Sequence, residues 1–129
     1  MSAYWDSSAL VESIFEPSLQ VRLRRERGVT RPHTLAEVFA VLTGNPQNRI
    51  EADAAATLVW QLASCLDFVE LTAPEMLAAL KSARKLGIRG GRVHDYFHAV
   101  AAKKSGAKKI VTLDKDDFLG LTEIALEII

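Results

Sequence analysis

Cysteine is almost absent from this chain of 129 residues, since Cys65 is the only one. A single thiol excludes an intramolecular disulfide framework and a zinc site built from cysteine pairs. No apolar run approaches the roughly 20 residues that a membrane-spanning helix needs. The first residues contain neither a basic segment nor an apolar one, so we expect no signal peptide. These absences lead us to expect a soluble, cytoplasmic protein.

The chain also lacks a net charge, because 16 Lys and Arg residues balance 16 Asp and Glu residues. This balance excludes a protein that binds its partners through bulk positive charge. An apolar fraction of 49% at zero net charge also argues against intrinsic disorder. The sequence shows no internal repeat, low-complexity stretch or linker. We therefore predict a single domain over residues 1–129.

The zero net charge hides blocks of opposite sign. Residues 80–109 carry nine Lys or Arg and a single acid, Asp95. Residues 16–36 form a second basic block, with five Arg and two Glu. Acids dominate elsewhere, with six against one Arg in residues 37–79 and five against one Lys in residues 110–129. Asp95 is therefore an isolated acid in the most basic part of the chain.

Short apolar runs alternate with amphipathic segments along the sequence. The predicted strands are residues 3–5, 29–31, 67–71 and 109–113. The predicted helices begin at Ala9, Pro17, Thr34, residue 51, the capping box Thr72–Glu75 and Val93, and they end before Pro17, at Gly28, at Thr43, at residue 65, near Gly87 and at Lys104. Residues 121–129 fit either a helix or a strand. This alternation predicts a three-layer α/β/α sandwich with a central, mostly parallel sheet.

Four acids are placed where such a fold binds ligands. Asp6 and Asp114 directly follow predicted strands, and ligands of open parallel sheets bind beyond the carboxyl ends of the strands. Glu37 and Asp95 lie at or near the starts of predicted helices. Converging carboxylates repel one another unless a cation lies between them, and their oxygen atoms suit Mg²⁺ or Mn²⁺. The acids therefore predict a metal site able to support phosphoryl chemistry.

Each acid also has a purely structural interpretation. Asp6 is placed to cap the helix that follows it, and Asp95 is a candidate cap as well. Glu37 stands three residues after Thr34, so the pair fits a capping box. Asp114 lies in a turn rich in acids, where solvated side chains are the ordinary explanation. The order and the spacing of the four acids, rather than any one of them, indicate a site.

These acids lie in four short motifs that follow one another over nearly the whole chain. The motifs are Tyr4-Trp-Asp-Ser-Ser-Ala-Leu-Val11, Thr34-Leu-Ala-Glu-Val38, Gly91-Arg-Val-His-Asp95 and Val111-Thr-Leu-Asp-Lys-Asp-Asp-Phe118. In this order they resemble the motifs of PIN-domain nucleases, in particular the VapC-type toxins of bacterial toxin–antitoxin pairs. The resemblance implies an α/β/α sandwich and an endoribonuclease that depends on Mg²⁺ or Mn²⁺. It also implies a homodimer and a cognate antitoxin protein that blocks the site.

The turn after the last predicted strand offers three acids for the fourth position of that family. Asp114, Asp116 and Asp117 are all possible ligands. We place Asp114 in direct contact with the metal, and Asp117 either behind the ligands, supporting them, or in contact with the metal through a bridging water. Ser8 and Thr112 are expected to hydrogen-bond to the ligand carboxylates.

Two histidines share the predicted helix of Asp95. His94 directly precedes this acid, and His98 follows it by one turn. Histidine at such positions invites a metal-binding interpretation. We prefer the interpretation in which both are helix histidines satisfied by water or backbone groups.

The resulting hypothesis is hydrolysis of RNA phosphodiester bonds, with Asp6, Glu37, Asp95 and Asp114 as the catalytic, metal-binding set. An acidic crevice repels a polyanion, so cations must attract the RNA. Arg89 and Arg92 precede Asp95 in a glycine-rich loop and are our candidates for RNA contacts. The arginines of the second predicted helix fit an RNA contact, an antitoxin contact or an ordinary solvent face; they are Arg22, Arg24, Arg25 and Arg27.

Partner surfaces are indicated by a few large side chains. We expect Trp5 in the core, whereas Trp60, Leu62 and Phe68 fit either the core or a dimer contact. The helical segments within residues 7–28 and 51–65 are the candidate contact surfaces.

Two rival functions use an acid after the first strand. A receiver domain has paired acids there, and a haloacid-dehalogenase-type phosphatase has Asp-x-Asp. In this chain Asp6 is followed by Ser7 and Ser8, so the sequence disfavours both of these Mg²⁺-dependent phosphotransfer domains. A PIN-fold protein that binds RNA or a partner without cleavage is the remaining alternative, although all four acids are present.

Overall fold

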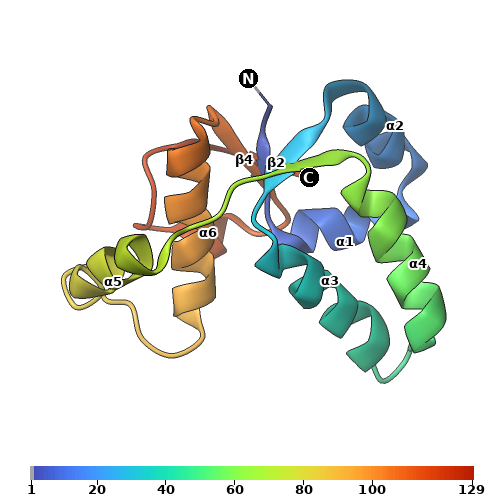
Figure 1. The fold of residues 1–129 in the computed structure, drawn as a ribbon, viewed down its shortest axis with the longest axis horizontal. Helices are drawn as coiled ribbons and strands as arrows, with labels where there is room; N and C mark the ends of the chain where they lie inside the picture. The colour runs from blue at the N-terminus through green and yellow to red at the C-terminus, as the bar shows by residue number, and fades with distance from the viewer. Residues whose placement is uncertain (1) are drawn as a thin grey trace.

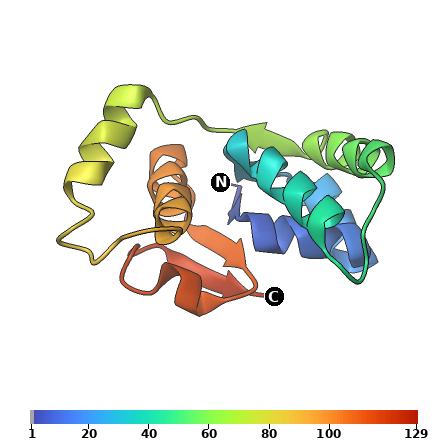
Figure 2. The same ribbon diagram turned by 90° about the horizontal axis from the view of Figure 1, so that it is seen from below.

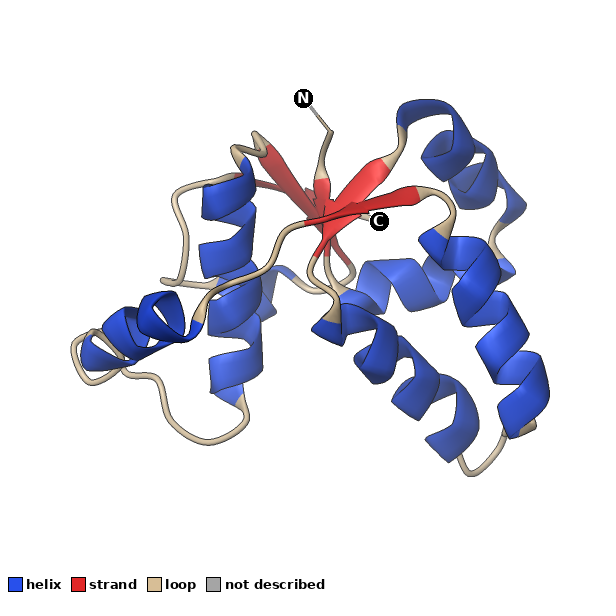
Figure 3. Ribbon diagram, in the orientation of Figure 1, coloured by secondary structure: helices blue, strands red, loops and turns tan. Residues whose placement is uncertain are grey.

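The computed structural model describes residues 2–129, and its elements alternate between strands and helices. In chain order they are β1 (Tyr4–Trp5), α1 (Ser7–Phe15), α2 (Pro17–Glu26), β2 (Gly28–Thr30), α3 (His33–Gly44), α4 (Ala52–Ala63), β3 (Leu66–Phe68), α5 (Ala73–Lys81), α6 (Arg92–Ser105), β4 (Lys109–Thr112), the 3₁₀ turn η1 (Lys115–Phe118) and β5 (Ala125–Ile128). The strands gather between two groups of helices, as Figure 3 shows.

The five strands form one parallel sheet in the order β3-β2-β1-β4-β5. Tyr4 of β1 lies beside Val29 of β2 on one side and Ile110 of β4 on the other. The chain adds β2 and β3 on one side of β1 and later adds β4 and β5 on the other side. The boundary between β1 and β4 is therefore the switch point at which open parallel sheets bind ligands.

Adjacent residues of β1 point to opposite faces of the sheet, because side chains alternate along a strand. Tyr4 packs with Ile110 and Tyr96 in a core beneath α5 and α6. Trp5 packs with Val111 and residues of α1 to α4 in a second core. Figures 1 and 2 show α5 and α6 on one side of the sheet and α1, α3 and α4 on the other. The predicted α/β/α sandwich is confirmed, and its sheet is entirely parallel.

The boundary between α2 and β2 differs from the prediction that Gly28 ends the helix. The helix ends at Glu26, and Arg27 takes a positive φ of 56°. Gly28 begins β2 instead. The position needs a glycine because a Cβ atom there would lie 2.9 Å from Cδ1 of Trp5. The glycine thus allows close packing between β2 and its surroundings rather than terminating a helix.

Further boundaries were predicted only approximately. The predicted capping box is present, since Thr72 and Glu75 bond reciprocally at the start of α5. That helix ends at Lys81 rather than near Gly87, and turns follow it. The preceding strand is β3, which ends at Phe68 rather than at residue 71. Residues 125–128, ambiguous in sequence, form β5, which pairs with β4.

The large side chains divide between core and surface. Trp5 is 1% exposed, which confirms the core prediction, and Leu62 is buried as well. Trp60 is 82% exposed on α4, and Phe68 is partly exposed at the outer strand β3.

Within residues 2–129, no helix combines the length and the apolar composition needed to cross a bilayer.

Candidate functional site

Asp6 follows β1 and is the N-cap residue of α1. Its carboxylate therefore caps the helix and lies at the carboxyl end of the strand. Its Oδ1 atom accepts hydrogen bonds from the N–H of Ala9 at 2.9 Å and from the Ser8 hydroxyl at 2.8 Å. Its Oδ2 atom accepts one from the Thr112 hydroxyl at 2.6 Å. A carboxylate oxygen has two lone pairs, so Oδ2 keeps one for a further ligand. The capping role of Asp6 and a role in binding are therefore compatible.

Ser8 and Thr112 join the ends of β1 and β4 around this carboxylate. The Ser8 hydroxyl accepts a bond from the N–H of Leu113 at 3.2 Å and lies 3.3 Å from the Thr112 hydroxyl. Thr112 is fully buried, and Asp6 is 3% exposed. These contacts fix the position of Asp6 at the switch point of the sheet. A contribution of Ser8 and Thr112 to metal binding stays a prediction.

Asp95 lies in the first turn of α6, where the charges of other acids change its pKa. Burial raises the pKa of Asp95, and the charges of Asp117 and Asp6 raise it further, whereas His98 and Arg92 lower it. The net result is a pKa of about 6, well above the ordinary value of an aspartate. The structure thus brings together acids from three distant parts of the sequence.

The acid-rich turn after β4 presents its side chains in different directions. Asp114 caps the turn, since its Oδ1 atom accepts a hydrogen bond from the N–H of Asp116 at 2.8 Å. Burial raises the pKa of Asp117, and the charges of Asp114 and Asp6 add to the increase. Asp117 is also the acid whose charge acts most strongly on Asp95. The sequence placed Asp114 in the ligand position, and which of the two acids binds a metal stays a prediction.

Glu37 is not part of a capping box. The helix α3 begins at His33, and no side chain caps its N-terminal end. The hydroxyl of Thr34 instead accepts a 2.8 Å hydrogen bond from Thr30, inside the core. The capping-box interpretation of Thr34 and Glu37 is therefore wrong, because tertiary contacts engage both side chains.

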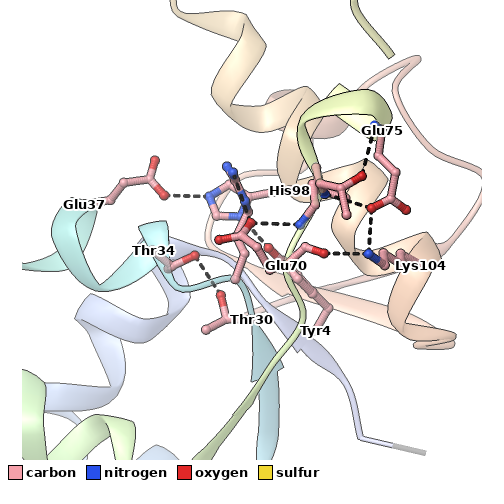
Figure 4. A network of polar contacts seen from close by, with 11 residues as sticks. Tyr4, Thr30, Thr34, Glu37, Glu70, Glu75, His98 and Lys104 are labelled. Atoms are coloured by element: carbon pink, nitrogen blue, oxygen red, sulfur yellow. Dashed lines mark hydrogen bonds and ion pairs between the residues drawn. The ribbon is translucent and has the colours of Figure 1, made fainter. Parts of the chain in front are cut away.

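Glu37 lies among the histidines of the chain. Its Oε1 atom is 2.9 Å from Nε2 of His98, a contact drawn in Figure 4. Burial by itself would raise the pKa of Glu37, but the hydrogen bond with His98 and the charges of His98, His33 and His94 outweigh it. The pKa of Glu37 therefore lies below its ordinary value, and the group is a carboxylate at neutral pH.

His98 connects Glu37 to the first strand. Its Nδ1 atom lies 2.7 Å from the hydroxyl of Tyr4, and both rings are buried. Burial raises the pKa of Tyr4, so the phenol keeps its proton and is available to donate a hydrogen bond to Nδ1. The Glu37 carboxylate can only accept a hydrogen bond, so Nε2 of His98 is the donor in the second contact. The expectation that water or backbone groups satisfy His98 is therefore wrong, since both of its partners are side chains.

The predicted RNA-contacting arginines differ in their surroundings. Arg92 donates a 2.6 Å hydrogen bond to the carbonyl of Leu119, and its charge lowers the pKa of both Asp95 and Asp117. Arg89 is exposed and forms no ion pair within residues 2–129. Arg92 therefore lies beside the acids, whereas Arg89 remains open to solvent.

Two arginines near the second helix are engaged within the fold. Arg22 binds Glu127 of β5 and lies over the ring of Trp5, with 5.2 Å between the guanidinium carbon and the ring centroid. Arg27 pairs with Asp67 at 3.0 Å. Both side chains stabilise contacts between distant segments, which reduces their availability for a partner.

The acids fit a divalent metal ion. Asp6, Asp95 and Asp117 offer oxygen atoms alone, the ligands that Mg²⁺ and Mn²⁺ prefer. Burial raises the pKa values of Asp95 and Asp117 most, repulsion from neighbouring aspartates raises them further, and Arg92 only partly offsets the increase. A divalent cation removes such repulsion.

A comparison with protein families gives one match over most of the chain. A model described as the PIN domain matches residues 3–123. The chain belongs to the PIN-domain family. PIN domains are generally nucleases, and they typically use a divalent metal ion. Family membership thus agrees with the resemblance of the four motifs, while the assignment to the VapC toxins goes further.

A solved structure shows the same fold. The crystal structure of PAE2754 from Pyrobaculum aerophilum matches this PIN domain with a TM-score of 0.70 at 19% sequence identity. The match covers 97% of this chain and 87% of the other. At this identity the likeness shows the fold alone. A comparison with curated protein sequences gives no match.

Sequence reasoning missed the roles of Tyr4, His33 and His98 around Glu37. One signal was available, because His33 precedes Glu37 by four residues and thus shares its face of α3. The position of α6 beside this face, which brings His94 and His98 to Glu37, depends on the packing of helices that are distant in sequence.

Proposed function

We propose that this PIN-domain protein is a metal-dependent endoribonuclease that acts as the toxin of a type II toxin–antitoxin pair. The observation that carries the nuclease proposal is the group of Asp6, Asp95 and Asp117 at the switch point of the sheet. The resemblance of the four sequence motifs to VapC-type toxins supports the biological role.

In this proposal Asp6 and Asp95 hold Mg²⁺ or Mn²⁺, together with Asp114 or Asp117 from the turn after β4. Glu37 completes the acidic set inferred from the motifs. When bound, the ion would lower the pKa of water, so that hydroxide is available as the nucleophile, and would stabilise the negative charge that develops on the phosphate.

The protein's own side chains organise this chemistry. Thr112 and Ser8 hold Asp6 through hydrogen bonds to both of its oxygen atoms. Arg92 offsets part of the negative charge of the acids before any ion binds. In the reaction the hydroxyl of water joins phosphorus, the bond to one ribose oxygen breaks, and that oxygen takes up a proton.

RNA must reach a group of negatively charged side chains, so the surrounding cations matter. Arg89 and Arg92 are our candidates for phosphate contacts at the entrance to α6. Two lysines of the basic block are engaged in ion pairs, Lys104 with Glu75 and Lys109 with Glu127. These pairs favour the two arginines over Lys104 and Lys109 as RNA-contacting residues.

The antitoxin and a second copy of the chain are the proposed protein partners. Trp60 is 82% exposed, and it lines an apolar groove between α3 and α4 with Leu35, Phe39 and Val59. Large exposed aromatic side chains are typical of interface centres. We therefore expect Trp60→Glu to weaken self-association, which sedimentation velocity measures. An unchanged association state would exclude this face as the dimer contact.

RNA cleavage tests the nuclease proposal directly. We expect the purified protein to cut RNA with Mg²⁺ or Mn²⁺ and to stop when a chelator is added. Asp6→Asn and Asp95→Asn should reduce the rate by at least about a hundredfold. Asp53→Asn, at an exposed position of α4 outside the four motifs, is the matched control and should retain activity. Cleavage that persists in both site variants, or that continues after the chelator is added, would contradict the nuclease proposal.

Expression in bacteria tests the toxin role separately. We expect growth arrest from the wild-type chain and normal growth with Asp6→Asn or Asp95→Asn. Normal growth with the wild type would contradict the toxin role while leaving the nuclease assay valid. RNA binding without cleavage in either metal would favour the alternative of a binding protein.

A further inference from the structure

All three histidines of the chain lie around one carboxylate, that of Glu37. His33 and Glu37 occupy one face of α3, one turn apart. His94 comes from the first turn of α6, in the opposite helical layer. One ligand atom from each of His33, Glu37 and His94 lies within 4.8 Å of the other two. This grouping joins two helices that are distant in the sequence.

The carboxylate in this group is held from behind. His98 contacts Oε1 of Glu37 at 2.9 Å, and the hydroxyl of Tyr4 fixes the opposite side of the His98 ring at 2.7 Å. His98 is 2% exposed and Tyr4 is fully buried, so the ring has no freedom to turn away. Oε2 of Glu37 therefore remains for a ligand. Metal-binding carboxylates are commonly oriented by such neighbouring hydrogen bonds.

The two outer histidines are available to bind. Their rings stack with 6.0 Å between centroids and 18° between planes, and both side chains are exposed. Within residues 2–129, neither ring makes a hydrogen bond to another side chain or to the backbone. Two adjacent imidazoles beside a carboxylate, open to solvent on one side, give an ion both ligands and an entrance.

We propose that His33, Glu37 and His94 bind one divalent transition-metal ion of the Zn²⁺, Co²⁺ and Ni²⁺ class. Two nitrogens and one oxygen suit these ions, whereas Mg²⁺ prefers oxygen ligands alone. The ligand atoms must approach to about 3.3 Å for tetrahedral bonds of about 2.0–2.1 Å. Rotations of the two exposed histidine side chains supply this movement. The remaining coordination position faces solvent.

This site shares Glu37 with the acidic set inferred from the motifs, but its other two ligands are imidazoles rather than the carboxylates of Asp6, Asp95 and Asp117. The neighbouring charges that affect the pKa of Glu37 are those of histidines. The charges that affect the pKa values of Asp95 and Asp117 are mainly those of other aspartates. An ion bound here connects α3 with α6 across the carboxyl edge of the sheet. The inference does not depend on RNA cleavage, and its test uses no activity.

Cobalt spectroscopy tests the proposal on the full chain after treatment with a chelator. We expect one equivalent of Co²⁺ to produce visible absorption bands, which Zn²⁺ abolishes and excess Mg²⁺ leaves unchanged. His33→Asn and His94→Asn should each weaken Co²⁺ binding by about tenfold or more. Both positions are exposed, so circular dichroism should show folded variants.

Asp6→Asn and Asp95→Asn are the matched controls, and they should keep the Co²⁺ spectrum of the wild type. Loss of the spectrum in Asp95→Asn would assign the ion to the acid group and overturn the proposal. An unchanged affinity in His33→Asn and His94→Asn, or the absence of Co²⁺ binding by the wild type, would overturn it equally.

Discussion

The hydroxyl of Thr112 donates a 2.6 Å hydrogen bond to Oδ2 of Asp6, although 106 residues separate the two in the sequence. The bond crosses from the end of β4 to the end of β1, the point at which the strand order reverses. Both side chains are buried, so water does not replace this donor if it is removed. The position of the proposed catalytic carboxylate therefore depends on a threonine of a neighbouring strand.

Thr112→Val should lower the free energy of unfolding by about 1–2 kcal/mol, because a buried carboxylate loses one donor. Urea denaturation measures the change. Thr57→Val is the matched control, since this exposed hydroxyl bonds only to the carbonyl of Asp53 in its own helix. Equal stabilities for the two variants would contradict the importance of the Thr112 bond.

His98→Leu should lower the free energy of unfolding by about 3 kcal/mol. The change leaves the buried hydroxyl of Tyr4 and the carboxylate of Glu37 without their shared partner. His94→Leu, on the same helix but exposed, should change stability by less than about 0.5 kcal/mol. Chemical denaturation of both variants makes the comparison, and a stable His98→Leu protein would exclude a structural role for the Tyr4–His98–Glu37 connection.

Gly28→Ala should lower the free energy of unfolding by about 1–3 kcal/mol through overpacking. The added Cβ would lie 2.9 Å from Trp5, 3.0 Å from Leu23 and 3.2 Å from Leu66. Gly44→Ala has nothing within 4 Å of its new Cβ at the end of α3, so it should be neutral or stabilising by up to about 1 kcal/mol. Denaturation midpoints that fail to separate the two variants would contradict the close packing of β2.

Asp95→Asn should stabilise the protein at high pH when a chelator keeps divalent ions away. The pKa of Asp95 is about 6 in the folded protein, above its ordinary value of 3.8. The folded state therefore holds the proton more tightly, and the wild type loses stability as pH rises from about 4 to 6. Above this window the variant should be more stable by about 1 kcal/mol after allowance for solvent screening.

Urea denaturation of Asp95→Asn and the wild type at pH 3, 6 and 8 checks this sign. The difference should become small near pH 3, below the pKa of the carboxyl group in both the folded and the unfolded state. A wild type that is more stable than the variant at pH 8 without divalent ions would refute the proposed repulsion among the acids.

Glu127 predicts the opposite dependence on pH. Its pKa is lowered to about 2, first by the hydrogen bond from Arg22 and then by that from Lys109, against the effect of burial. The resulting stability is present above about pH 4.5 and is lost as pH falls towards 2. Glu127→Gln should lower the free energy of unfolding by about 1 kcal/mol at pH 7 and have no effect near pH 2.

Acid-induced unfolding followed by circular dichroism measures this effect. Glu123→Gln, an exposed position without an ion pair in the described part of the chain, is the matched control and should follow the wild type at every pH. A Glu127→Gln curve that overlays the control would show that the Arg22–Glu127 contact contributes no stability.

The layered fold was predictable because its signals are local. Short apolar runs such as Ile110–Val111 mark buried parallel strands, and Thr72 with Glu75 marks a helix start through contacts three residues apart. The edge that carries Asp6 follows from the same reasoning, since parallel strands share their carboxyl ends. The tail around Leu126 was ambiguous because its apolar run fits both periods, and only pairing with β4 makes it a strand.

The details of the site were less predictable because contacts between distant residues decide them. Glu37 could have completed a capping box with Thr34, but His98, 61 residues away, holds its carboxylate. Among the acids after β4, the sequence could not show that Asp114 turns back onto Asp116 while Asp117 acts most strongly on Asp95. These orientations depend on the packing of α3, α6 and η1, which no local pattern encodes.

The sequence by itself determined the order of strands and helices as far as β4 and the placement of Asp6 at a binding edge, because periodicity and capping are local properties of the chain. Only the tertiary structure decided which side chains meet there. It grouped Asp6, Asp95 and Asp117, and it gathered three histidines around Glu37. The physical reason is that charge repulsion and hydrogen bonding act over a few ångströms in space, whatever the separation along the chain.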